Sequence, residues 1–483
     1  MSSPDVPVVG APATPVPVAT ASGGTARRVP LWLAILATSL PMFMATLDNL
    51  VMTSALPVIR ADLGSSVGQL SWFMNAYTLT FATFMLTAAT LGDRLGRRRM
   101  MLVGITVFTL ASIASALSAS SEALIAARAV QGLGAAAIMP LSLTLLASAV
   151  PPQMRAAAIG IWGGVSGLGV ALGPVIGGAV VEGVSWQAIF WLNVPVALVA
   201  VPLLLLSVRE SRGAWQRLDL VGAGLLGGAV FLGIWGIVHG NDDGWSSAGV
   251  LGSLVAAAVL VPAYLGWTRG RAHAVLPLRL FSSRGFSVAN VIGLTFTIGM
   301  FGTVFLLAQY LQVVQGYTPL EAGLRTLPWT AAPMVVAPIA GAIAGRTGLR
   351  SLLVTGLVLQ TASLVWFAAL TENGSGYRAF VPALLMAGVG MGLTFAPSAA
   401  AVLDGLPDAD FAVASSANST VREFGVALGI ALLTAVFLGN GGELSPTGYD
   451  GAIGPALLTG AAAVAVAVAA ALFAPGRSRE SAV

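Results

Sequence analysis

Residues 91–99 read Leu91-Gly-Asp-Arg-Leu-Gly-Arg-Arg-Arg99 and separate two long apolar segments, which cover residues 70–92 and 99–118. Each segment is long enough to cross a bilayer as an α-helix, because one span needs about 20 apolar residues. The Arg cluster between them suits the inner surface of a membrane, where basic residues gather and meet anionic lipid. The stretch therefore predicts two membrane helices joined by a short cytoplasmic connection.

The rest of the chain repeats this pattern. Its 483 residues are 57% hydrophobic and 9% charged, whereas soluble proteins are about 25% charged. The apolar segments are too long for barrel strands, which have about 10 residues. We therefore expect an all-α polytopic membrane protein with fourteen transmembrane helices. The segments cover residues 31–56, 70–92, 99–118, 122–148, 155–181, 186–208, 218–239, 247–268, 286–313, 320–345, 350–371, 379–403, 411–438 and 453–474.

The distribution of Arg predicts the orientation. All 23 basic residues are Arg, and with the N-terminus in the cytoplasm 18 of them fall in cytoplasmic segments. Arg60 and Arg378 then fall in outside loops, whereas Arg128, Arg325 and Arg422 fall within helices. Since basic residues favour the cytoplasmic side, we expect a multi-pass protein of the cell (inner) membrane with both termini in the cytoplasm.

Missing residue types exclude several kinds of chemistry. The chain has no Lys, no Cys and only two His, so it lacks a Walker lysine, a thiol nucleophile and a His-rich metal site. No nucleophile with a base beside it is discernible, and the net charge of +4 reflects membrane orientation rather than nucleic-acid binding. We therefore expect no enzyme, no metal, no cofactor and no nucleic-acid partner, and carboxylates and Arg must carry any charge-dependent work.

An internal repeat suggests a duplicated six-helix unit. Residues 92–98 align with residues 344–350, and residues 169–173 echo residues 425–429. Internal repeats with a site between them are typical of secondary transporters. The predicted divisions are a disordered cytoplasmic tail (1–29), an N-terminal six-helix bundle (30–208), two inserted helices with a cytoplasmic loop (209–285), a C-terminal six-helix bundle (286–474) and a cytoplasmic tail (475–483).

Ionisable residues inside apolar segments mark a candidate site. Asp48, Arg128 and Glu423 lie within predicted spans, and an intramembrane charge indicates an ion or proton site by default. Arg128 needs a partner in the bundle interior, and Gln131 shares its helix face. From the residues alone, Asp48 could instead be a neutral, hydrogen-bonded acid, and Arg128 could extend towards the membrane surface.

Residues 160–178 carry Gly at three- and four-residue spacing and include Pro174. Small residues let helices approach closely, and a proline kinks a helix by removing a backbone donor. Packing is the predicted physical role of this segment. The hypothesis is that this packing closes the space between the two halves during gating.

These stretches resemble the major facilitator superfamily, and specifically its fourteen-helix drug:proton antiporter branch. The resemblance rests on residues 91–98, Arg128–Gly134 and Gly169–Gly178, in that order. The family's helix-one motif is also matched, except that Leu50 and Thr53 replace a usual Thr and Asn.

The resemblance implies alternating access of two six-helix halves around a central cavity, with proton entry exchanged for export of a drug or another hydrophobic organic compound. Such proteins confer multidrug efflux and antibiotic resistance, and use the proton gradient as their energy source. The expected partners are a small organic substrate, protons and the lipid bilayer, and the expected form is a monomer. Together the residues and the resemblance predict three sets of site residues. Proton coupling is predicted at Asp48, Arg128 and Glu423, and gating at Gly92, Asp93, Arg94, Gly96, Gly173 and Pro174. The predicted substrate cavity contains Asp48, Asn49, Trp72, Tyr77, Gln131 and Arg422.

Other functions stay open at this point. A dedicated exporter of one endogenous metabolite, or an importer, keeps the fold and changes the task. A non-transporting receptor or scaffold predicts instead that Asp48 and Arg128 can be neutralised without effect.

Overall fold

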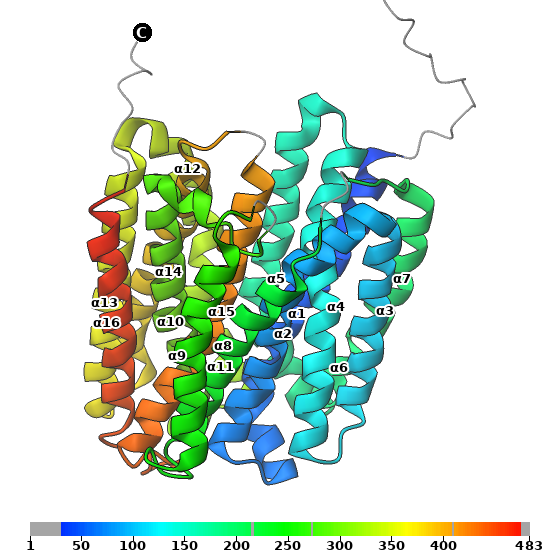
Figure 1. The fold of residues 1–483 in the computed structure, drawn as a ribbon. Helices are drawn as coiled ribbons and strands as arrows, with labels where there is room; N and C mark the ends of the chain where they lie inside the picture. The colour runs from blue at the N-terminus through cyan, green and yellow to red at the C-terminus, as the bar shows by residue number, and fades with distance from the viewer. Residues whose placement is uncertain (1–29, 214–216, 272–273, 408–409, 475–483) are drawn as a thin grey trace, which may run out of the picture.

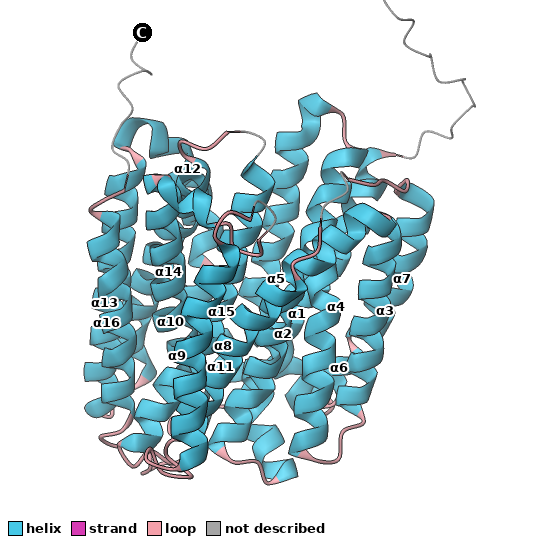
Figure 2. Cartoon of the chain, viewed as in Figure 1, coloured by secondary structure: helices cyan, strands magenta, loops and turns pink. Residues whose placement is uncertain are grey.

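A computed structural model describes residues 30–213, 217–271, 274–407 and 410–474. Among these residues the regular elements are all helices, with no strand (Figure 2). The helices lie side by side along a common direction (Figure 1), which confirms the predicted all-α fold. The predicted tails at 1–29 and 475–483 lie outside the described residues.

The described helices fall into two groups with a helical hairpin between them in the sequence. The first helix group contains α1 (Leu31–Leu63), α2 (Val67–Leu95), α3 (Arg97–Ala116), α4 (Ser121–Ala149), the short η1 (Pro152–Met154), α5 (Arg155–Gly183), α6 (Ala188–Trp191) and α7 (Asn193–Ser207). The hairpin contains α8 (Leu220–His239) and α9 (Ala248–Thr268), followed by η2 (Leu278–Ser282). The second helix group contains α10 (Arg284–Val313), α11 (Pro319–Thr330), α12 (Ala332–Thr347), α13 (Leu349–Glu372), α14 (Tyr377–Leu403), α15 (Phe411–Gly439) and α16 (Ile453–Ala471).

Thirteen helical stretches among the described residues are long and apolar enough to cross a membrane. The pair α6 and α7 forms one of these stretches, and α11 and α12 form another. Helix α2 is not among the thirteen, because polar side chains such as Ser71, Asn75 and Thr78 dilute its apolar residues. These three side chains are buried, so α2 carries its polar groups inside the protein. With α2, all fourteen predicted segments are helical.

Several helices turn large apolar side chains outwards. Leu198 of α7 and Val255 of α9 are 70% and 61% exposed. Apolar side chains covering the outside of a helical bundle belong in contact with lipid. The chain is therefore a multi-pass membrane protein.

The structure corrects three predicted boundaries. Helix α1 continues through Pro57, so that Arg60 lies in its last turn rather than in an outside loop. Arg378 likewise lies in the first turn of α14. The predicted connection at 91–99 is mostly helical, because α2 and α3 leave only Gly96 between them. Gly96 has φ of 119°, a conformation open to glycine, so a single residue makes the turn.

Both described ends of the chain lie at one end of the bundle, where α1 begins and α16 ends (top in Figure 1). Arg94, Arg209 and Arg346 lie at the same end, which we call the Arg-rich end. We call the other end of the bundle the opposite end. Helix α8 packs against both α2 and α15, so the α8–α9 hairpin lies beside the junction of the two helix groups.

The connection at Gly96 has a counterpart in the second helix group. Gly348 separates α12 from α13 and has φ of 83°. The close packing of α5 on α1 also has a counterpart, since α15 packs on α10. The same local geometry thus occurs twice in the chain.

Candidate functional site

A buried ion pair joins Asp48 of α1 to Arg128 of α4. One oxygen of the Asp48 carboxylate accepts a hydrogen bond from the Arg128 guanidinium. The other oxygen accepts from the Gln131 side-chain amide at 2.8 Å. Asp48 is 5% exposed and Arg128 is fully buried. Each charge has therefore exchanged water for the other charge and for fixed dipoles.

Arg128 is held from several sides. Its Nε donates to the backbone carbonyl of Phe73 at 3.1 Å, and the guanidinium also donates to Gln131 Oε1 at 2.8 Å. The ring of Tyr77 lies 4.4 Å from the guanidinium carbon, close enough for a cation–π contact. Arg128 therefore cannot move without breaking contacts to α1 and α2.

Glycines bring α4 close enough to its neighbours to place Arg128. A Cβ atom at Gly132 would lie 2.3 Å from the carbonyl oxygen of Tyr77 in α2. A Cβ atom at Gly134 would lie 2.5 Å from the backbone nitrogen of Phe108 in α3. Only glycine permits such approaches. The Gly residues that follow Arg128 thus fix the helix contacts around the ion pair.

The structure adds two residues to this site that the sequence analysis missed. Asn193, the first residue of α7, donates its side-chain amide to Asp48 at 2.8 Å and to the Ser112 hydroxyl at 2.8 Å. Ser112 in turn donates to the backbone carbonyl of Phe190 at 2.8 Å. A lone Asn inside an apolar segment was the available signal, because polar residues at membrane depth usually serve a function.

A central cavity of about 590 Å³ lies beside the ion pair, between the two helix groups. This volume suits a drug-sized molecule, since ligand pockets measure roughly 300–1,000 Å³. Tyr77 both lines the cavity and contacts Arg128, so it lies between the cavity and the ion pair. The lining is mostly apolar and contains Phe81, Met139, Phe301, Met334, Met391 and Phe395.

The residues predicted for the substrate cavity divide into three sets. Asn49, Tyr77 and Arg422 line the cavity, and Glu423 lines it beside Arg422. Asp48 and Gln131 are instead enclosed in the buried network described above. Trp72 does not line the cavity. Its ring lies 5.7 Å from that of Phe231 in α8, because this side of α2 faces the hairpin.

At the opposite end the two helix groups close against each other. A Cβ atom at Gly178 of α5 would lie 2.2 Å from the carbonyl oxygen of Pro319, and one at Gly323 of α11 would lie 2.3 Å from that of Pro174. Beside these contacts, a Cβ atom at Gly173 would lie 2.5 Å from Cβ of Leu50 in α1, which belongs to the same helix group. At Gly178 and Gly323 the backbones of the two groups are thus in direct contact, and the predicted gating residues Gly173 and Pro174 lie in this closed region.

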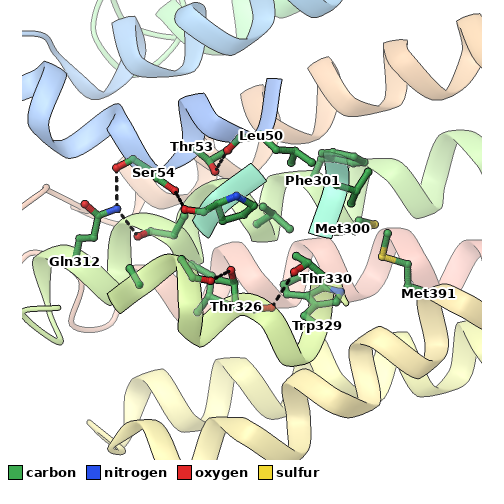
Figure 3. Close-up of a pocket in the computed structure, with 17 residues that line it drawn as sticks. Leu50, Thr53, Ser54, Met300, Phe301, Gln312, Thr326, Trp329, Thr330 and Met391 are labelled. Atoms are coloured by element: carbon green, nitrogen blue, oxygen red, sulfur yellow. Dashed lines mark hydrogen bonds between the residues drawn. The ribbon is translucent and has the colours of Figure 1, made fainter. Parts of the chain in front are cut away.

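Hydrogen bonds reinforce the closed region, as Figure 3 shows. The Gln312 side chain of α10 donates to the backbone carbonyl of Ser54 in α1 at 3.2 Å. The Ser54 hydroxyl donates to the carbonyl of Pro174 at 2.9 Å. A space of only about 30 Å³ remains there, beside Trp329 and Thr330, and this is far too small for an organic substrate.

Towards the Arg-rich end, α5 has a different environment. Among the described residues, no atom from outside α5 lies within 4 Å of the Cβ positions of Gly160, Gly163, Gly164 and Gly167, and all four line the central cavity. One helix is therefore in contact with the second helix group along its last turns and separated from it along its first turns. The cavity extends towards the Arg-rich end.

The remaining predicted gating residues surround the turn at Gly96. Gly92 packs on Leu141 of α4, and Arg94 lies in the last turn of α2. The Asp93 carboxylate accepts from Arg97 Nε at 2.7 Å, within the same connection.

A segment that follows α7 covers this connection. The backbone nitrogen of Gly213 donates to the Asp93 carbonyl at 3.1 Å. The Glu210 carboxylate accepts the backbone N–H groups of Arg98 at 2.9 Å and Arg99 at 3.1 Å. A negative charge at these free N–H groups stabilises the beginning of α3.

Comparison with known proteins agrees with this architecture. The chain is 34% identical over 420 residues to the tetracenomycin C resistance and export protein of Streptomyces glaucescens, covering 86% of this chain and 77% of that protein. It is 34% identical over 406 residues to the multidrug resistance protein Stp of Mycobacterium tuberculosis, covering 84% and 75%. A crystal structure of the peptide transporter POT in complex with sulfate has the same fold, with a TM-score of 0.65 at 18% identity, covering 92% of this chain and 96% of that one.

The family model of the Major Facilitator Superfamily matches residues 38–430. That range runs from α1 into α15 and so includes the ion pair, the central cavity and the glycine contacts that close the opposite end. This chain belongs to the Major Facilitator Superfamily.

Proposed function

We propose that this protein is a secondary active transporter that exports hydrophobic organic compounds in exchange for protons, by alternating access. The relatives named above are a resistance and export protein and a multidrug resistance protein, which supports export as the direction. No cofactor is needed, because the proton gradient supplies the energy. A single chain contains the whole cavity, so a monomer suffices.

One observation carries this proposal. The cavity is sealed at the opposite end by direct backbone contact and is lined by free glycines towards the Arg-rich end. A path that is closed on one side at a time is what alternating access requires. The Arg-rich end would face the cytoplasm by the positive-inside rule, so the described state is the one that loads substrate from the cell interior.

Proton coupling is assigned to the Asp48–Arg128 pair, with Glu423 as a second protonatable group. Protonation of Asp48 would leave Arg128 as an uncompensated buried charge, and such a charge destabilises its surroundings by about 3–5 kcal/mol. That free energy can favour the other facing state. Tyr77 touches both Arg128 and the cavity, and so connects the charge change to the substrate space.

Gating is assigned to both ends of the bundle. The contact between Pro174 and Gly323 must open at the opposite end when the cavity turns outwards, while Gly173 keeps α5 close to α1. At the Arg-rich end, Gly92, Asp93, Arg94 and Gly96 surround a one-residue turn, and this turn would move as the first helix group rotates. Two helix groups that rotate against each other as rigid bodies suit such a motion.

The decisive experiment measures proton movement in proteoliposomes with oriented protein and an imposed pH gradient. A panel of lipophilic cations and neutral aromatic drugs is added, and an internal pH dye reports exchange. We expect exchange with wild-type protein and loss of it with Asp48→Asn. Asp62→Asn is the matched control, because Asp62 lies on the same helix and is exposed.

Three results would contradict the proposal. Substrate movement without proton movement would make the protein a uniporter. Full exchange with the Asp48→Asn variant would show that Asp48 is not the coupling residue. Binding without any movement would favour a receptor.

A further inference from the structure

Only two charged residues line the central cavity within the described chain. They are Arg422 and Glu423, neighbours on α15. Both are partly exposed to the cavity, whereas the Asp48–Arg128 pair is enclosed on all sides. A molecule in the cavity therefore meets one cation and one anion.

The backbone and the first side-chain carbons of Arg422 are packed against α10, whereas its guanidinium makes no hydrogen bond to a described residue. Its backbone carbonyl accepts a hydrogen bond from Thr297 at 3.0 Å, and its Cγ lies 3.0 Å from the Cβ position of Gly293. The guanidinium carbon lies 4.6 Å from the centre of the Phe395 ring. Among the described residues, no carboxylate lies within ion-pair distance of the guanidinium. Its hydrogen-bond donors remain available to a ligand.

Glu423 is also unpaired within the described chain. Its carboxylate accepts no hydrogen bond from a described residue and forms no ion pair with Arg422. Adjacent residues of a helix point about 100° apart, so the two charges face the cavity separately. Two opposite charges that do not satisfy each other can each take a partner from the substrate.

We propose that the cavity selects amphoteric aromatic compounds, whose acidic group binds Arg422 and whose amine binds Glu423. Phe81, Phe301 and Phe395 supply aromatic surface for the body of such a molecule, next to Met139 and Met391. A compound with only a positive charge meets repulsion from Arg422, and one with only a negative charge meets repulsion from Glu423.

This inference rests on the proposed function, since it names the compounds that are exported. The amine of an amphoteric substrate competes with a proton for Glu423. The charged groups around that carboxylate are Arg422 beside it and the Asp48–Arg128 pair beyond Tyr77. Competition between proton and substrate for one group is a direct way to exchange them.

The test uses four probes that share one fluorophore. Nα-dansyl-lysine carries a free carboxylate and a free amine. Its methyl ester keeps only the amine, its Nε-acetyl form keeps only the carboxylate, and the Nε-acetyl methyl ester is neutral. Binding to purified wild-type protein at pH 7.5 is followed by dansyl fluorescence. We expect the amphoteric probe to bind about tenfold more tightly than each singly charged probe, because it makes one additional charge-assisted contact, and more tightly still than the neutral probe, which makes neither contact.

Substitutions then assign each contact. Arg422→Gln should weaken the two carboxylate-bearing probes about tenfold and leave the methyl ester unchanged or tighter. Glu423→Gln should weaken the two amine-bearing probes and leave the Nε-acetyl form unchanged or tighter. Arg378→Gln and Glu443→Gln are the matched controls, because both residues are exposed and lie outside the cavity.

The inference is overturned if any of the other three probes binds wild-type protein as tightly as Nα-dansyl-lysine does. The wild-type comparison decides this even if a variant fails to fold. If lipophilic cations still exchange with protons in that case, the proposed function stands without the inference. If the amphoteric probe is preferred but no compound moves protons, the inferred binding site is supported and the proposal of proton-coupled export is contradicted.

Discussion

At the scale of single residues, the Asp48 carboxylate is held on both of its oxygens. It receives hydrogen bonds from Arg128, Gln131 and Asn193, which come from two different helices. Any movement of Asp48 must therefore break contacts to both α4 and α7.

Asn193→Leu tests the contribution of the third donor. The substitution removes one hydrogen bond to the Asp48 carboxylate and leaves Arg128 in place. Because the Asp48 carboxylate loses one of its three donors, the network around Arg128 should loosen, and proton-coupled substrate exchange should fall about tenfold. Asn440→Leu, at an exposed site, should leave exchange unchanged, and full exchange with Asn193→Leu would mean that Asn193 only supports packing.

Arg128→Met tests the ion pair itself. It leaves Asp48 buried without its counter-charge, which should destabilise the protein by about 3–5 kcal/mol. The double variant Asp48→Asn with Arg128→Met removes both charges and should recover much of that loss. Urea unfolding in detergent, followed by tryptophan fluorescence, measures the difference. Equal stability of Arg128→Met and wild-type protein would show that the pair contributes little.

At the scale of elements, α5 has two distinct parts. Gly178 touches the backbone of α11, whereas Gly163 has open space at its Cβ position. Gly178→Val should therefore force α5 and α11 apart and reduce transport at least tenfold, while Gly163→Ala should be tolerated.

A cysteine reporter can read out this separation. The natural chain has no cysteine, so a single Ser54→Cys provides an unambiguous labelling site in the closed region. An impermeant maleimide added from the opposite end should label it slowly in the otherwise natural protein and quickly in the Gly178→Val background. Equal rates in both would show that the glycine contact does not close the path.

An ion pair at the Arg-rich end ties η2 to the start of α15. The two terminal nitrogens of the Arg279 guanidinium, Nη1 and Nη2, donate to the Asp410 carboxylate at 2.6 and 2.7 Å. These hydrogen bonds lower the pKa of Asp410. The folded-state pKa thus lies below the unfolded value of about 3.9, so the stabilisation is present above that pH and is lost as the pH falls through the folded value.

Asp410→Asn should consequently lower the melting temperature slightly at pH 7 and have a smaller effect the further the pH falls below the unfolded value of about 3.9. Thermal unfolding over a series of pH values measures this. Because the pair is partly exposed, raising the salt concentration should also shrink the difference at pH 7. A difference that persists unchanged in acid would assign another role to Asp410.

At the scale of the whole molecule, alternating access predicts opposite changes at the two ends. In proteoliposomes without a gradient, Gly163→Cys should be labelled readily from the Arg-rich end and Ser54→Cys should be protected. Acidifying the solution at the opposite end should slow labelling of the first and speed labelling of the second. Parallel changes at both positions would indicate loosening rather than a change of facing state.

The sequence predicted the helical segments well because each span must be long and apolar. It did not predict helix ends such as Arg60, since membrane helices often continue into the interfacial region. It placed Arg128 beside Gln131 correctly, because their spacing follows from helix geometry. It could not show that Asp48 pairs with Arg128, or that Asn193 joins them, because these contacts depend on how distant helices pack. Trp72 was misplaced because α2 is covered on more than one side.

The glycine contacts at the opposite end have a consequence for speed. Gly178 and Gly323 meet backbone carbonyls rather than interlocking side chains. Such a contact can part without any side chain passing through an eclipsed torsion, so rotamer barriers contribute little to its opening. The movement of the buried charges should then govern the activation enthalpy of turnover. Separation of the two helix groups at the closed end would add little to it.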